Sequence, residues 1–268
     1  TDYHINKGII HFYQKNYSIA YMEFVKAISI APDTPEAIEI IGHLHMNQDD
    51  FGQAEKYYRI LLESERPNTQ FYAQLWLIGL RLAQGRYSEC KNEIIRGLKN
   101  AEKKQLESNR STLLNSLAYI NLRMGHLEEA FAASEQAQRI ASNLKFYFDK
   151  INAMRLNGIV LLRMNKIEEA KMMASLLKDY LESIQIPKYK RYYHHSERMI
   201  AEYENREAET LENFKKGISL LSYQYEAFND HALHFYSLAR SCYKMNDPEQ
   251  ARTEFDKIIN LTTGRLQW

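Results

Sequence analysis

The sequence of 268 residues contains nine histidines, which are its first candidates for chemistry. Neutral imidazole binds transition metals, and the side chain titrates near neutral pH. His194 and His195 are adjacent, so a helix cannot turn both of them toward one ion. His231 and His234 are three residues apart and can share a helix face, but no Cys or carboxylate at metal-ligand spacing accompanies them. We therefore expect no metal site.

Motifs for catalysis and for phosphate binding do not occur in the sequence. There is no G-x-S-x-G elbow, no P-loop and no G-x-G-x-x-G, and HHSE at 194–197 is not H-E-x-x-H. Cys90 and Cys242 lie far apart, and we interpret them as buried, reduced thiols that fit a reducing compartment such as the cytoplasm. We expect no enzyme, no catalytic residue and no cofactor.

Composition and charge argue against two further classes of protein, those that bind nucleic acid and those that span a membrane. A net charge of +1 without any Lys/Arg-rich tract is a poor match for nucleic acid, and no apolar run is long enough to cross a membrane. Only 10 Gly and 5 Pro occur in the chain. Because strands and tight turns use those residues, their scarcity favours helices.

One short phrase recurs along the chain. GHLEEA at 125–130 returns as NKIEEA at 165–170, and related phrases bring the number of copies to seven. The last residue of the phrase is always small, being Ala20, Ala54, Cys90, Ala130, Ala170, Thr210 and Ala251. The first residue is Lys15, Asp49, Gly85, Gly125, Asn165, Asn205 and Asn246. Gly and Asn accept the left-handed backbone just past a helix end, so the phrase predicts a helix stop, a turn and a new helix.

The residues on either side of the phrase also fit a pair of helices joined by a turn. A small residue stands about seven positions before most stops, and apolar or small residues follow each anchor four and seven positions later. Those spacings lie on one helical face. Each unit is therefore predicted to be a pair of helices with small residues where the two approach closely.

These units resemble the tetratricopeptide repeat. In the first copy Gly8, Ala20, Phe24, Ala27 and Pro32 stand where the 34-residue consensus places such residues. The resemblance implies an all-α fold, a right-handed superhelical solenoid of fourteen helices in seven antiparallel pairs, with stacked copies sharing one core. The expected single domain of residues 1–268 divides at approximately 1–34, 35–70, 71–110, 111–150, 151–190, 191–231 and 232–268. The sixth copy departs from the pattern, since Arg198 stands where the family has Gly or Ala.

Spacing between the anchors gives the style of repeat. The intervals between the seven small anchors are 34, 36, 40, 40, 40 and 41, so the later copies carry about six extra residues. Long repeats of this kind are similar to those of bacterial peptide-sensing regulators, of bacterial signalling ATPases and of kinesin light chains. The richness in Lys, Asn, Ile and Tyr favours a bacterial source. We expect the chain to be a fragment, with additional repeats or an output domain in its parent.

The resemblance also implies a binding face, because in this family the first helix of each pair lines a concave groove. The positions concerned hold Glu39, His43, Trp76, Asn115, Tyr119, Arg123, Arg155, Arg163, His195, Tyr203, Tyr236, Arg240, Tyr243 and Lys244. Tyr, Trp and Arg often become hot spots of binding, and the later copies are rich in Arg, which favours an acidic peptide or protein partner. We expect a non-catalytic scaffold for protein interaction. The alternative is a peptide-sensing arm that switches an attached output domain.

Overall fold

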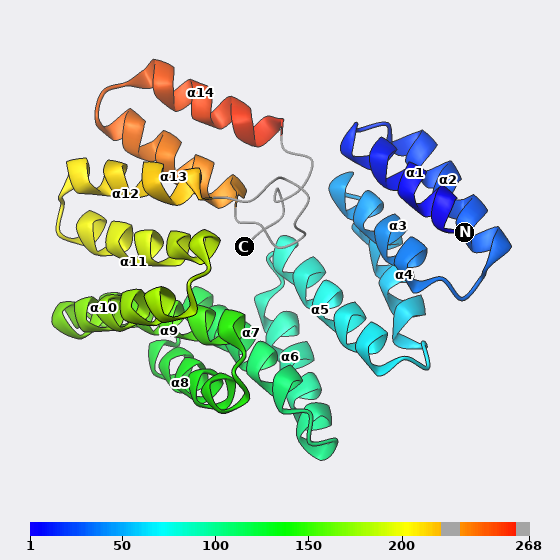
Figure 1. The fold of residues 1–268 in the computed structure, drawn as a ribbon, viewed down its shortest axis with the longest axis horizontal. Helices are drawn as coiled ribbons and strands as arrows, with labels where there is room; N and C mark the ends of the chain where they lie inside the picture. The colour runs from blue at the N-terminus through cyan, green and yellow to red at the C-terminus, as the bar shows by residue number, and fades with distance from the viewer. Residues whose placement is uncertain (221–230, 261–268) are drawn as a thin grey trace. The chain divides into compact units, whose positions relative to one another are not determined.

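Helices make up the regular structure of this chain. The structure, a computed structural model, describes residues 1–220 and 231–260, and only the backbone of residues 231–234. The described ranges contain fourteen α-helices and one short 3-10 helix, and no residue in them lies in a strand (Figure 1). The all-α prediction is therefore confirmed. The sixth and seventh copies each include residues outside the described ranges. The side chains of His231 and His234 also lie outside what the structure describes.

The helices follow each other with short connections. Their bounds are α1 Asp2–Tyr13, α2 Tyr17–Ile30, α3 Pro35–Asn47, α4 Phe51–Leu62, α5 Pro67–Ala83, α6 Tyr87–Lys103, α7 Glu107–Met124, α8 Leu127–Leu144, α9 Tyr147–Arg163, α10 Ile167–Ile184, η1 Pro187–Tyr189, α11 Lys190–Tyr203, α12 Glu207–Ser219, α13 His231–Lys244 and α14 Pro248–Ile259. Proline stands in the first turn of α3, α5 and α14, where its missing N–H is not needed.

The chain divides into two compact units. Among the described residues, the first unit contains 1–86 with α1 to α5, and the second contains 87–220 and 231–260 with α6 to α14. The division falls between α5 and α6, which are the two helices of the predicted third copy. A single solenoid of seven copies therefore stays a prediction, and the units are described one at a time.

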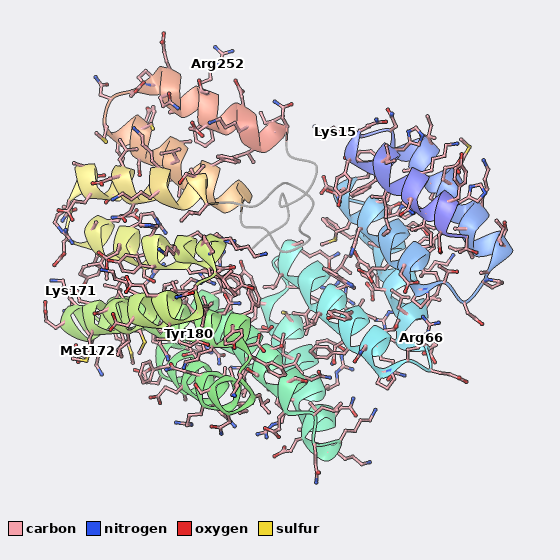
Figure 2. The ribbon with its side chains drawn as sticks, in the orientation of Figure 1. Lys15, Arg66, Lys171, Met172, Tyr180 and Arg252 are labelled. Atoms are coloured by element: carbon pink, nitrogen blue, oxygen red, sulfur yellow. The ribbon has the colours of Figure 1, made fainter. Side chains whose placement is uncertain are left out.

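The stop residues between paired helices adopt the predicted left-handed backbone conformation. All seven stop residues have a positive φ, from 58° at Asn205 to 80° at Gly125. This left-handed conformation lets the chain turn back at once, since it bends the backbone out of the helix. Lys15, labelled in Figure 2, accepts the same conformation with a φ of 62° although it is not glycine or asparagine.

The small anchors lie where two helices meet. The seven anchor residues are each no more than 2% exposed. In the first unit Phe24 is fully buried against Gly8, and a Cβ added at Gly8 would overlap its ring. The small anchors are therefore buried in the first turn of each second helix, where the repeated phrase placed them.

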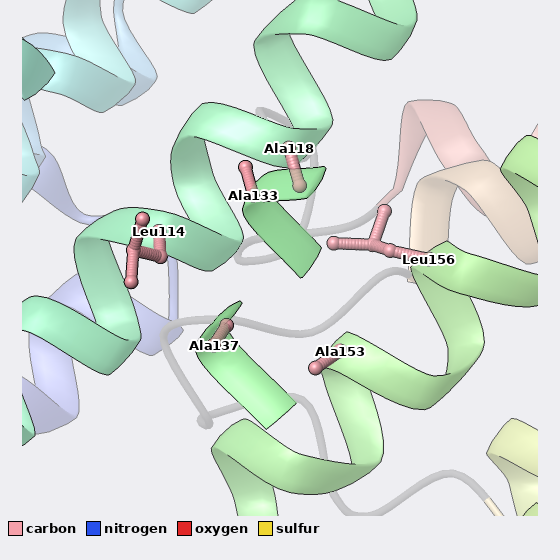
Figure 3. Close-up of a cluster of buried hydrophobic side chains, with 6 residues drawn as sticks. All are labelled: Leu114, Ala118, Ala133, Ala137, Ala153 and Leu156. Carbon is pink, nitrogen blue, oxygen red and sulfur yellow. The ribbon is translucent and has the colours of Figure 1, made fainter. Parts of the chain in front are cut away.

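One core cluster of the second unit is built largely from alanine. Leu114, Ala118, Ala133, Ala137, Ala153 and Leu156 form one buried cluster in which α7, α8 and α9 meet (Figure 3). Next to this cluster, the Ser134 hydroxyl donates a hydrogen bond to the side-chain oxygen of Asn157, and both residues are buried. The alanines bring the backbones close together, and the polar pair fixes α8 against α9.

The extra residues of the later copies lengthen a particular set of helices. The six helices from α5 to α10 have 17 or 18 residues, whereas α1 to α4 have 12 to 14. In the middle copies the second helix also ends in a left-handed residue, at Gln105, Lys145 and Gln185. These residues are 40 positions apart, so the long copies repeat a second stop that the shorter copies lack. None of the described helices has the length and hydropathy needed to cross a bilayer.

Candidate functional site

Three candidates in the first unit lie together around one histidine. His43 Nδ1 is 2.8 Å from the Tyr58 hydroxyl, and His43 Nε2 is 3.3 Å from a carboxylate oxygen of Glu39. The edge of the imidazole ring also meets the Trp76 indole, with ring centroids 4.3 Å apart. Glu39 and His43 come from α3, Tyr58 from α4 and Trp76 from α5.

Both ring nitrogens of His43 have a polar neighbour, the Tyr58 hydroxyl at Nδ1 and the Glu39 carboxylate at Nε2. Burial raises the pKa of Tyr58. Trp76 also packs against the buried cluster that contains Tyr58, Leu77 and Leu80. These candidates are thus engaged with each other, and binding by them stays a prediction.

Asn115 is tied to the start of the next copy. It is 8% exposed, and its side-chain nitrogen donates to the main-chain oxygen of Asp149, at 2.9 Å. The Asp149 carboxylate accepts a hydrogen bond from Thr112, at 2.9 Å, while burial raises the pKa of that carboxyl group. These bonds attach α7 to the first turn of α9. They hold the first helices of copies four and five side by side.

Aromatic and basic side chains follow on the same helices. Arg123 donates to the Tyr87 hydroxyl at 3.0 Å, and this bond raises the pKa of the guanidinium. Tyr119 lies one turn earlier on α7, where burial raises the pKa of its phenol and the charges of Arg123 and Arg155 oppose that rise. Arg155 on α9 is half-buried, with its guanidinium carbon 5.9 Å from the ring centre of Tyr192 on α11. Candidates from copies four and five therefore lie within electrostatic reach of each other.

Arg198, on α11, belongs beside these residues although its position in the repeat did not suggest it. It is 7% exposed, and its guanidinium carbon lies 4.6 Å from the ring centre of Phe214. The guanidinium donates to Glu202 at 2.9 Å and to the sulfur of Met199 at 2.8 Å. Burial lowers the pKa of Arg198 to about 10, Glu202 opposes this, and the charge of Arg155 lowers it further.

This set is called the α7–α9–α11 face below, and it consists of Tyr119, Arg123, Arg155, Tyr192 and Arg198. Helix α9 packs against both α7 and α11, so the set spans three neighbouring helices, although Tyr192 and Arg198 are themselves buried. The sequence predicted Tyr119, Arg123 and Arg155. Tyr192 and Arg198 were missed, and the only signal for Arg198 was that a long charged residue replaced a small one. His195 also lies on α11 and is 7% exposed.

The other candidates of the second unit form local contacts of their own. Arg163 is exposed at the end of α9, and the exposed Tyr203 donates to the side-chain oxygen of Asn165, at 2.6 Å. On α13, Arg240 lies over the ring of Tyr236, with the guanidinium carbon 5.8 Å from the ring centre. The two remaining candidates on α13 are also exposed, namely Tyr243 and Lys244.

Ion pairs join neighbouring copies outside these candidates. Lys171 on α10, labelled in Figure 2, lies 2.8 Å from Glu204 and 3.1 Å from Glu168. In the first unit Arg81 contacts Glu55 at 2.6 Å and, with Arg59, lowers the pKa of that carboxyl to about 2. Among the described residues, no three His, Cys, Asp or Glu side chains are grouped so that they could hold a metal ion. Cys90 and Cys242 are both buried thiols.

Comparison with known proteins identifies the type of fold. The helical hairpins are of the tetratricopeptide type, and a family model described as "Tetratricopeptide repeat" matches residues 111–144, which belong to α7 and α8. The chain therefore has a tetratricopeptide-repeat fold, as the sequence predicted. No curated protein sequence matches the chain.

Several solved structures are similar to the chain. Aspartyl phosphate phosphatase F from Bacillus subtilis has a TM-score of 0.70 at 15% identity, over 96% of this chain and 69% of that one. The apo form of RapI has a TM-score of 0.68 at 11% identity, over 95% and 94%. The Rap conjugation gene regulator of plasmid pLS20, in complex with the Phr* peptide, has a TM-score of 0.61 at 17% identity, over 94% and 71%. At these identities the likeness is one of fold.

Proposed function

We propose that this chain is a non-catalytic scaffold that binds a peptide on the α7–α9–α11 face. The observation that supports this proposal best is that one face, formed by the first helices of three successive copies, is made of tyrosine and arginine. Those residue types provide most hot spots of protein interfaces, since each combines a large contact area with directed hydrogen bonds. A similar fold holds the Phr* peptide in the pLS20 regulator. We place this activity in the cytoplasm, because both cysteines are buried thiols rather than the halves of a disulfide.

The proposal is tested with peptides selected on the protein itself. A random peptide library displayed on phage is enriched on the whole chain, and fluorescence anisotropy then measures the affinity of one labelled, enriched peptide. Arg123→Glu reverses an exposed charge on the face. Arg139→Glu makes the same change at an exposed arginine on α8, the second helix of the same copy, and serves as the matched control.

We expect Arg123→Glu to weaken binding by about fivefold or more, which corresponds to about 1 kcal/mol. The control should bind like the wild type, and both variants should keep its helical circular dichroism. Equal losses in the two variants would mean that the peptide does not use this face. A library from which no peptide is enriched would contradict the proposal as a whole.

A second candidate function is a peptide-sensing arm that switches an attached output domain. It is favoured by the likeness to a structure described as a gene regulator in complex with a peptide. Small-angle X-ray scattering of the chain with and without a saturating enriched peptide separates the two functions. A sensor changes its scattering curve when the peptide binds, whereas a rigid scaffold keeps the same curve.

A further inference from the structure

Exposed apolar side chains gather at the turn between α8 and α9. Four of them are between 39% and 46% exposed, namely Leu144, Phe146, Tyr147 and Phe148. We call these four residues the aromatic turn. An exposed apolar patch is unfavourable in water, so it indicates a surface that binds something else.

The repeat itself shows that helix packing does not require these side chains. The turn between α6 and α7, 40 positions earlier, has the same left-handed backbone at Gln105 that the aromatic turn has at Lys145. Polar residues stand there in place of the first, third and fourth members of the aromatic turn, namely Lys104, Glu107 and Ser108. The two turns therefore fold alike with and without exposed apolar residues. The aromatic turn is particular to its copy, and binding accounts for it better than packing does.

Lysines surround the aromatic turn. One lies within it, two come from the turn before it and two from the turn after it, and all five are exposed, namely Lys145, Lys103, Lys104, Lys188 and Lys190. We call these five residues the lysine rim. Every member stands at or next to a turn that joins a second helix to the first helix of the next copy.

Contacts between copies hold these three turns near each other. The ring centroids of Phe148 and Tyr189 are 6.3 Å apart, which joins the aromatic turn to η1. On the other side, the Thr112 hydroxyl of α7 donates to the Asp149 carboxylate of α9 at 2.9 Å. The aromatic turn and the lysine rim therefore form one edge of the second unit.

Acidic side chains only partly balance the lysines of this edge. The exposed acids near the ends of α6 and α10 are Glu102, Asp179 and Glu182. Glu107 is paired with Arg110, at 2.6 Å, and Asp179 stands next to Lys178. The edge therefore carries an excess of positive charge, although the net charge of the whole chain is only +1.

We propose that the aromatic turn and the lysine rim dock the chain on a membrane surface that contains anionic lipids. The apolar side chains enter the zone between head groups and acyl chains, where aromatic residues are favoured. The lysines attract the negative head groups over a distance of about one Debye length. Apolar area and positive charge together match this surface. None of the residues involved belongs to the α7–α9–α11 face, so the inference does not depend on peptide binding.

Single-stranded nucleic acid is the other ligand that combines lysines with aromatic rings. Its bases stack on open ring faces, whereas Phe148 lies tilted against Tyr189 and Tyr192, at interplanar angles of 46° and 71°. Leu144 has no ring for a base to stack on, but it adds apolar area that a membrane can bury. The membrane is therefore the better match.

Sedimentation with lipid vesicles tests the proposal. The whole chain is mixed with vesicles of phosphatidylcholine and phosphatidylserine in equal amounts, and separately with vesicles of phosphatidylcholine alone. We expect the chain to sediment with the anionic vesicles only. Added salt should weaken this binding, because it screens the attraction between lysines and head groups.

Two double variants separate the apolar and the charged contribution. Leu144→Lys with Tyr147→Glu gives the turn the residues of the preceding copy and leaves the net charge unchanged. This variant should fold like the wild type and bind anionic vesicles about fivefold or more weakly, since less apolar area enters the membrane. Lys145→Gln with Lys190→Gln should also weaken binding about fivefold or more, because two cations are lost.

Met172→Lys with Leu176→Glu is the matched control for the apolar change. Both residues are exposed on α10, and Met172 lies toward the opposite end of that helix from Tyr180 (Figure 2). The control should bind vesicles like the wild type. Tyr147→Trp then reports insertion directly. Its added fluorescence should be quenched by lipids that are brominated in their acyl chains.

Three results would overturn the proposal. The chain could sediment with neither kind of vesicle. It could bind anionic vesicles equally well with Leu144→Lys and Tyr147→Glu in place, so that the aromatic turn has no part in binding. A labelled oligouridylate, followed by fluorescence anisotropy, could bind the wild type and lose its affinity in this variant while vesicles stay unbound. That last result would identify a surface for nucleic acid.

Discussion

The same substitution should have opposite effects at two equivalent glycines. Gly42 in α3 and Gly158 in α9 occupy the same place in the second and fifth copies, seven residues before the stop. A Cβ at Gly42 would lie 2.9 Å from Cδ1 of Tyr58 and closer still to another ring atom. A Cβ at Gly158 would meet only Cγ of Met173, at 3.8 Å, which is an ordinary contact.

The magnitudes follow from helix propensity and packing. Replacing glycine by alanine inside a helix stabilises the helix by about 1 kcal/mol at either position. Overpacking a tight contact costs about 1–3 kcal/mol. Tyr58 cannot move aside easily, because it is 1% exposed and its hydroxyl is bound to His43. We expect Gly158→Ala to raise the free energy of unfolding by about 1 kcal/mol and Gly42→Ala to lower it by up to about 2 kcal/mol.

Urea unfolding followed by far-UV circular dichroism measures both changes. Hydrogen exchange read by mass spectrometry assigns them, because peptides from α3 and from α9 report on the first and second unit separately. Gly52→Ala is the control in the first unit, since a Cβ there would meet only a carboxylate oxygen of Asp50, at 3.9 Å. The reasoning is refuted if Gly42→Ala is as stable as the Gly52 and Gly158 variants, because Tyr58 would then give way freely.

Three further predictions concern acidity, packing and turns. The pKa of Glu55 is lowered to about 2, so the stability that its charge provides is complete above about pH 4.5 and is lost as the pH falls toward 2. Glu55→Gln should remove up to about 1 kcal/mol of this acid-dependent stability. Urea unfolding at several pH values measures the difference. Ala130→Leu and Ala170→Leu should each cost about 1–3 kcal/mol, and variants that melt with the wild type would contradict the register. Gly125→Ala should lower the melting temperature by an amount equivalent to about 1 kcal/mol, because its φ is 80° and no neighbour lies near the added Cβ.

The features of the fold that the sequence predicted are those with local causes. A left-handed stop and a small residue at a close contact are each required by the few residues around them, so every copy repeats them. The stops at Gln105, Lys145 and Gln185 were not predicted, because glutamine and lysine rarely adopt a positive φ and no glycine marks these turns. Only the equal spacing of 40 residues connects them.

The candidate site was harder to predict because its residues also pack against the rest of the chain. A position in the repeat indicates which way a side chain leaves the helix, but not which side chain from the next copy it meets. His43 is bound to Tyr58, and Asn115 is bound to the main chain of Asp149. Both partners come from another helix, and their identity follows from packing rather than from the period of the repeat.

Arg198 shows how a departure from a repeat can carry information. Six of the copies form their close helix contact with a small residue, whereas the sixth has a guanidinium there and surrounds it with Phe214, Met199 and Glu202. Burying a charge in a helix pair is costly, and a structural role alone would be filled more cheaply by alanine. Here the hydrogen bond to Glu202 and the contact with the Phe214 ring offset part of that cost. A copy that fits its family poorly is therefore a good place to look for what is particular to this chain.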